Sequence, residues 1–209
     1  MPSSRLRETS LTYDISAETN AQSSPLLRLP AELRNRIFGY VLGGHEVRFV
    51  WEDKPRHQRS NRIFEIQRAG ENSVMTSEEK KRFLSLTLAS RQIYTETAML
   101  PFAANTFVFV GLRHPEEAEK WLAQLFLPAQ QNAIATVQCP IQNLFFDFAM
   151  GLVGLVASRH CLGIFRQLEG LQCLIVETEN FRLNVLGKEV VAGKIRRAHG
   201  KDKLKIVFL

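Results

Sequence analysis

The sequence predicts a mixed α+β or α/β fold, in which a helical N-terminal part with a hairpin insertion precedes a series of βα units. Apolar residues follow helical spacing in residues 30–42 and again after Thr76. Two short runs of alternating polar and apolar residues lie between these helices, at 45–51 and 62–67. From Asn105 onwards, β-branched and aromatic runs recur about every 30 residues with helical stretches between them, which is typical of parallel βα units.

Composition fits a globular protein and excludes several classes. The 209 residues are 45% hydrophobic and 23% charged, which is enough apolar material for one packed domain. The longest apolar run, residues 148–157, is shorter than the ~20 residues that a membrane-spanning helix needs. No apolar stretch follows Arg5 and Arg7, so no signal peptide is expected. Three cysteines without paired spacing favour a reducing compartment. We therefore expect an intracellular protein, cytoplasmic or nuclear, with no membrane association.

Residues 1–24 are polar with little periodicity and predict a disordered arm. The helix after them is predicted from its two ends. Pro30 suits the first helical position, where its missing N–H needs no partner, and Glu32 suits the positive end of the helix dipole. Gly43 and Gly44 provide the helix exit. One apolar side of this helix is predicted from four residues at helical spacing: Leu33, Ile37, Tyr40 and Val41.

Residues 43–75 form an insertion after this helix. The runs 45–51 and 62–67 predict two strands, joined by a long polar hairpin loop. Thr76 and Glu79 have capping-box spacing, so a second helix is expected to begin there and to end at Pro101 as the longest helix of the chain. Its predicted buried face comprises Leu86, Ala89, Ile93 and Leu100.

The second half divides into an α/β body, residues 105–192, and a basic C-terminal segment, residues 193–209, after a helical region at 25–104. Strands are predicted at 105–110, 141–148 and 171–177, with a closing strand at 204–209. Helices are predicted at 114–125, 128–136 and 155–168.

Two segments of the helical region resemble a known family. Residues 29–38 read Leu-Pro-Ala-Glu-Leu-Arg-Asn-Arg-Ile-Phe, and residues 90–97 read Ser-Arg-Gln-Ile-Tyr-Thr-Glu-Thr. The first segment resembles the opening helix of an F-box. Together, in this order, the two segments resemble a group of fungal F-box-like proteins of unknown function.

The resemblance implies a protein-interaction module that meets the adaptor of an SCF-type ubiquitin ligase and delivers an unknown protein target to it. By this resemblance, the partner-binding residues are Leu29, Pro30, Leu33 and Ile37, with Leu86 and Ile93 as core support. A second role is open for the apolar side of the helix, namely packing on Ile93 and Leu100 inside the fold. The βα units resemble irregular leucine-rich repeats, and a compact mixed α/β layer fits them equally well.

The sequence contains no catalytic, metal-binding or phosphate-binding motif that supports an enzyme. None of the five histidines pairs with a cysteine at zinc-site spacing, so no metal site is predicted. Cys161 beside His160 is better explained as a core cysteine than as a nucleophile. Gly151 and Gly154 follow a predicted strand but lack the lysine and third glycine of a phosphate-binding loop. We therefore predict a protein without enzymatic activity and without cofactors.

The net charge of +6 is concentrated near the C-terminus. Six cations lie in residues 194–205 against Asp202 alone: Lys194, Arg196, Arg197, Lys201, Lys203 and Lys205. Such a segment is typical of a nuclear-localisation or nucleic-acid patch, and the alternative function is a nuclear factor that acts through it. A solvated surface strip is the favoured interpretation, because no aromatic side chain lies among these cations to stack on bases. Nucleic acid is therefore not the expected partner.

Overall fold

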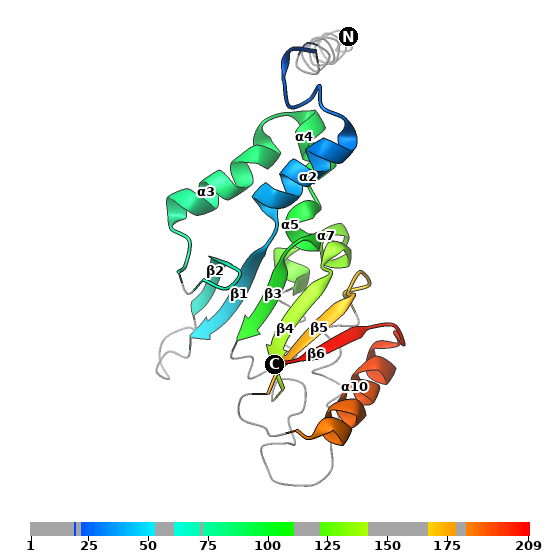
Figure 1. Cartoon of the computed structure of the whole chain (residues 1–209). Helices are drawn as coiled ribbons and strands as arrows, with labels where there is room; N and C mark the ends of the chain where they lie inside the picture. The colour runs from blue at the N-terminus through cyan, green and yellow to red at the C-terminus, as the bar shows by residue number, and fades with distance from the viewer. Residues whose placement is uncertain are drawn as a thin grey trace, which may run out of the picture.

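The computed structural model describes residues 19, 22–52, 61–71, 73–110, 122–141, 167–178 and 183–209. Within these residues the strands form one six-stranded sheet in the order β2-β1-β3-β4-β5-β6. The helices α2, α3 and α4 gather beyond the end of the sheet where β1 begins, and α10 lies beside β6 at the opposite side of the molecule (Figure 1).

The sheet is mostly parallel. The strands are β1 (His45–Glu52), β2 (Asn61–Arg68), β3 (Thr106–Val110), β4 (Thr136–Pro140), β5 (Cys173–Glu177) and β6 (Lys205–Phe208). β1 and β2 pair antiparallel as a hairpin, with Phe49 opposite Phe64. β3 then pairs parallel with β1, and each later strand pairs parallel with the strand before it. The mixed α+β or α/β class predicted from the sequence is confirmed.

The described helices are mostly short. They are α2 (Ala31–Leu42), α3 (Ser77–Ser85), the 3-10 turn η1 (Leu86–Leu88), α4 (Arg91–Thr97), α5 (Leu100–Ala103), α7 (Pro128–Ala133) and α10 (Val185–His199). The predicted capping box begins α3, because the Thr76 amide donates to Glu79 Oε2 at 2.8 Å and the Glu79 amide donates to Thr76 Oγ1 at 3.2 Å.

The main core lies on one face of the sheet. Alternate strand residues supply it, for example Val137 and Cys139 in β4, between which Gln138 is only half-buried. Val191 and Ile195 of α10 cover this face. Phenylalanine rings fill the part of the same core that lies at β1 and β3, where Phe49 stacks on Phe109 at 5.1 Å between ring centroids.

The hairpin belongs to the sheet. The sequence prediction placed residues 43–75 as an insertion in the helical region, with a boundary between residues 104 and 105. In the structure β1 pairs with β3 over five residue pairs, from Glu46 with Thr106 to Val50 with Val110. The boundary therefore divides one sheet. Parallel pairing across so long a connection leaves no local pattern in the sequence, which is why the insertion was predicted as a separate unit.

The long helix predicted from Thr76 to Pro101 is wrong in its length. The chain forms α3, η1, α4 and α5 in its place. Ser90 breaks the run, because its backbone is extended (φ −158°, ψ 161°) and its Oγ accepts from the Ile93 amide at 3.2 Å as the N-cap of α4. Pro101 does not end a helix but occupies the first turn of α5, where a proline is tolerated.

Strand β4, Thr136–Pro140, was not predicted as a strand from the sequence. The strand predicted at 141–148 lies outside the described residues, apart from Ile141. The basic segment 193–209 comprises the last part of α10, a turn and β6. The short helix at 128–136 and the strands at 105–110, 171–177 and 204–209 are confirmed as α7, β3, β5 and β6.

Several predicted elements lie outside the described residues. These are most of the arm 1–24, most of the helix 114–125 and nearly all of the helix 155–168. In the part of the chain that the structure describes, no helix combines the length and apolar character needed to span a membrane.

Candidate functional site

Helix α2 has two apolar sides with different surroundings. Phe38 and Leu42 are fully buried. Phe38 packs with Leu27 and Ile93, and Leu42 packs with Ile66 and Phe83. Because residues four apart share a helix face, Phe38 and Leu42 with Arg34 define the side that joins α2 to the rest of the fold.

The other side of α2 is open to solvent. We call Leu33, Ile37, Tyr40 and Val41 the α2 stripe. Their exposed fractions are 47%, 37%, 78% and 44% in that order. Among the described residues, therefore, neither the hairpin nor α3 covers the stripe, and the alternative that this side packs on Ile93 and Leu100 does not hold. Phe38 makes that contact instead.

An ion pair holds α2 against α4. Arg34 Nη2 lies 2.7 Å from Glu96 Oε1, and Arg34 Nε lies 2.9 Å from Glu96 Oε2, which is the paired geometry that a guanidinium and a carboxylate favour. Arg34 Nη1 also donates to the carbonyls of Leu27 and Leu29, at 3.1 and 2.6 Å. The hydrogen bond from Arg34 lowers the pKa of Glu96 from its ordinary value, and the same bond raises the pKa of Arg34.

A buried asparagine joins α2 to the sheet. Asn105 Oδ1 accepts from the His45 amide at 2.8 Å, and Asn105 Nδ2 donates to the carbonyls of Leu42 and Pro101 at 2.6 and 2.8 Å. One side chain therefore fixes the end of α2, the start of β1 and the first turn of α5. Beside it, burial lowers the pKa of His45, whose ring meets Phe83 edge-on at 4.8 Å.

Of the four predicted partner-binding residues, Leu29 and Pro30 directly precede α2 and Leu33 and Ile37 lie within it. Pro30, Leu33 and Ile37 are exposed, while Leu29 is half-buried and its carbonyl accepts from Arg34. Ile93 is buried and Leu86 packs against the same cluster, where the sequence placed them as core support. The sequence analysis missed Phe38, Glu96 and Asn105. Phe38 follows Ile37 directly and so lies about 100° from it around the helix, outside the predicted stripe.

The six basic residues differ in their exposure and in their contacts. Lys201 Nζ donates to the carbonyls of Glu169 and Leu171, and Arg196 Nε donates to the carbonyl of Leu204 at 3.1 Å. Arg197 Nε lies 3.4 Å from the Gly193 carbonyl in its own helix. Arg197, Lys203 and Lys205 are exposed, and Lys194 is half-buried. At least two of the cations therefore hold backbone carbonyls within the fold.

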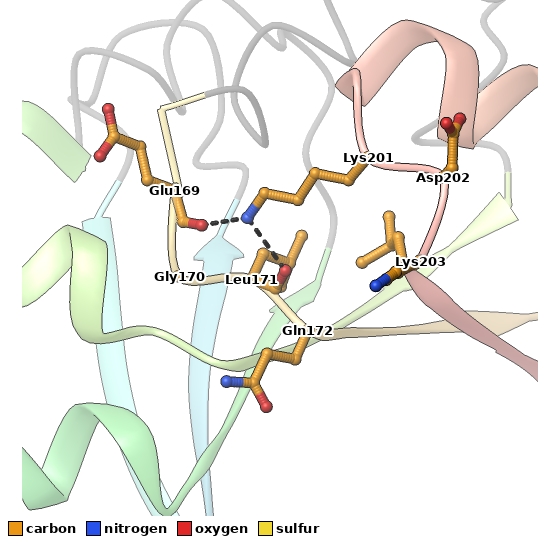
Figure 2. Close-up of a pocket in the computed structure, with 8 residues that line it drawn as sticks. Glu169, Gly170, Leu171, Gln172, Lys201, Asp202 and Lys203 are labelled. Carbon is orange, nitrogen blue, oxygen red and sulfur yellow. Dashed lines mark hydrogen bonds between the residues drawn. The ribbon is translucent and has the colours of Figure 1, made fainter.

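A pocket of about 720 Å³ lies beside the turns that precede β5 and β6 (Figure 2). One turn supplies Glu169, Gly170, Leu171 and Gln172, and the other supplies Lys201, Asp202, Lys203 and Leu204. Figure 2 shows the Lys201 side chain crossing between the two turns, with its amine on the two carbonyls. The pocket is at the N-terminal ends of parallel strands, whereas ligands of open α/β sheets bind at the carboxyl ends. We assign Lys201 the structural role of joining the turns.

Most residues that the sequence analysis considered for nucleophilic catalysis or phosphate binding lie outside the described residues. These are Cys161, His160, His114, Gly151 and Gly154. Cys139 is a buried cysteine in β4 and Cys173 a half-buried cysteine in β5. In the described ranges, no three or more His, Cys, Asp or Glu side chains gather in a way that could hold a metal ion.

Comparison with known proteins gives a family. No curated protein matches the sequence. A solved structure of the A domain of carboxylic acid reductase from Segniliparus rugosus, in complex with AMP and a co-purified carboxylic acid, aligns with 92% of this chain and 30% of that chain, at 12% identity and a TM-score of 0.29. A likeness at this TM-score supports no inference. The profile of a domain of unknown function, DUF7730, matches residues 18–151, which is more than half of the 209 residues. The chain therefore belongs to the DUF7730 family.

Proposed function

We propose that this protein is a non-enzymatic interaction module that docks a protein partner through the α2 stripe, and that the partner is the adaptor of an SCF-type ubiquitin ligase. The exposure of the stripe on a fixed helix carries this proposal. Four large apolar side chains on one side of a single helix are more than the scattered apolar residues found on any protein surface.

The fixed side of α2 makes the stripe suitable for binding. Phe38 and Leu42 are buried, and Arg34 is held by Glu96 and two carbonyls. A partner that meets the stripe therefore meets a helix that is already ordered, so little conformational entropy is lost on binding. An apolar helix side that fits a groove is a common mode of protein recognition.

The sheet would serve as the receptor for the target. Its strands from β3 to β6 follow one another in chain order and in parallel, which supports an organisation like that of leucine-rich repeats. On the face opposite the core, Gln138 Nε2 donates to Glu177 Oε1 at 2.6 Å across β4 and β5, and half-buried Thr136 and Ile175 lie nearby in the register. In this proposal the chain positions its target and breaks no bond itself.

Co-expression with the adaptor, followed by gel filtration, tests the proposal. The variant L33D/I37D places two carboxylates on the stripe, and N35D places one carboxylate on the same helix away from it. Circular dichroism establishes that each variant is folded. We expect wild type and N35D to co-elute with the adaptor and folded L33D/I37D to elute alone. Absence of co-elution for the wild type would contradict the adaptor as partner.

A further inference from the structure

We propose that β6 and α10 form the interface of a homodimer, in which the two copies of β6 pair antiparallel and join the two sheets. The proposal begins with a difference between the two edges of the sheet. At the β2 edge, the Met75 amide donates to the Ile66 carbonyl at 2.8 Å, and Gln67 bridges to Val74. At the β6 edge, no strand of the described ranges pairs with the outer side.

The outward groups of β6 follow from its hydrogen bonds to β5. The Lys205 amide donates to the Gln172 carbonyl and the Leu209 amide donates to the Val176 carbonyl, each at 3.0 Å. Since alternate residues of a strand turn their backbone groups to opposite sides, the N–H and C=O groups of Ile206 and Phe208 point away from β5. They form a template for another strand.

A second copy of β6 fits this template. If two copies run antiparallel about Val207, Ile206 of each lies opposite Phe208 of the other, and each pair exchanges two backbone hydrogen bonds. Ile206 and Phe208 are the β6 residues that pack against the main core, so the opposed side chains would both be apolar and on one face. A strand of four residues is short, however, and needs support from the neighbouring helix.

Helix α10 provides that support through charge. Lys188 Nζ lies 5.7 Å from the Phe208 ring centroid and Arg196 Nε donates to the Leu204 carbonyl, so this side of α10 runs along β6. Glu189 is exposed and lies next to the side of α10 that runs along β6. It precedes Arg196 by seven residues, which is about two helical turns, so the two residues lie on the same side of the helix. In two antiparallel copies of α10, Glu189 of each would therefore face Arg196 of the other.

One two-fold axis can relate both the two β6 strands and the two α10 helices. Lys188 is level with Phe208, and Arg196 is level with Leu204. The midpoint of this part of α10, near Ala192, is therefore level with Ile206. Ile206 is one residue from Val207, the proposed centre of the strand pair. Gly193 at this midpoint has no side chain, and a Cβ added there would meet nothing within 4 Å. Two α10 helices can therefore approach closely. The complementarity is of this surface to itself, which favours a second copy over an unrelated partner.

The dimer does not rest on the proposed docking function, because α2 lies at the other side of the molecule (Figure 1). Sedimentation velocity of the full chain over a wide concentration range measures it. I206P removes an outward N–H and leaves the hydrogen bonds to β5 in place. E189R and R196E each replace the opposite-charge pairs by like-charge pairs.

We expect the wild type to dimerise and each of these variants to dissociate about tenfold more readily or more. An equimolar mixture of E189R and R196E restores opposite-charge pairs at both positions, so mixed dimers are expected where neither variant dimerises alone. Circular dichroism checks that each variant is folded. A wild type that is monomeric at every concentration would overturn the proposal, as would a dimer that all three variants and their mixture leave unchanged.

Discussion

Arg34 and Glu96 show, at the scale of single residues, how two distant segments hold one helix in place. They are 62 positions apart, and yet they share two hydrogen bonds of 2.7 and 2.9 Å. Asn105 adds three bonds that fix the end of the same helix to β1 and α5. Polar side chains therefore orient α2, while the apolar residues beside them bury its inner side.

The Arg34–Glu96 pair makes stability depend on pH in the acidic range. The folded state lowers the pKa of Glu96, chiefly through the hydrogen bond from Arg34, so the unfolded state binds the proton more tightly. The contribution is present above the ordinary pKa of a glutamate and is lost as the pH falls through the folded-state pKa. We expect E96Q to be less stable than wild type at neutral pH and to lose less stability on acidification, as measured by urea unfolding at several pH values. Parallel acid profiles of the two proteins would contradict this assignment.

Asn105→Ala removes three hydrogen bonds from a side chain that is only 2% exposed. We expect a loss of about 3 kcal/mol in the free energy of unfolding, because buried backbone groups lose their partners. Asn105→Asp is the matched variant, since its oxygen still accepts from His45 while the two donor contacts are lost. Chemical denaturation of the three proteins gives the comparison. An alanine variant as stable as wild type would show that these bonds do not hold the junction.

At the scale of the element, α2 separates stability from binding on two sides. Phe38→Ala is expected to cost about 3–5 kcal/mol, because the ring is fully buried among Leu27 and Ile93. L33D/I37D is expected to cost about 1 kcal/mol, since both side chains are exposed. Thermal or urea unfolding measures both. Equal losses in the two variants would mean that the stripe is part of the core.

The sequence predicted an element well where its signals were local. The proline and glycine boundaries of α2, the Thr76–Glu79 capping box and the alternation in β1 all act within a few residues, and each element is present. The break at Ser90 was missed because helical spacing continues across it from Leu86 to Ile93. Ser90 followed by a helical run is an N-cap signal, and it decides the structure there.

At the scale of the whole molecule, the sequence predicted the hairpin of β1 and β2 but not its pairing with β3. Periodicity reports which residues share a face, whereas the pairing of β1 with β3 depends on contacts between residues 60 positions apart. The main core therefore includes Val47 and Phe49 of the hairpin together with Leu174 and Val176 of β5. Strands predicted as two units share this core.

The candidate site was predictable only in part, because periodicity identifies the residues of one helix side but not whether that side is buried. Helical spacing groups the α2 stripe, and the F-box resemblance indicates a docking role for Leu33 and Ile37. The sequence left open whether this side was buried. That question is decided by Phe38, Arg34 and Glu96, which attach the opposite side of α2 to α4 and so turn the stripe outwards. Which side of a helix meets the core depends on tertiary partners.

The affinity of the purified SCF adaptor for this protein, measured by isothermal titration calorimetry with wild type, N35D and L33D/I37D, tests the central claim most directly. We expect wild type and N35D to bind equally, and L33D/I37D to bind about a hundredfold more weakly or not at all, because two carboxylates would be buried in an apolar contact. Equal affinity of all three proteins would contradict the α2 stripe as the docking surface, and absence of binding by all three would contradict the adaptor as its partner.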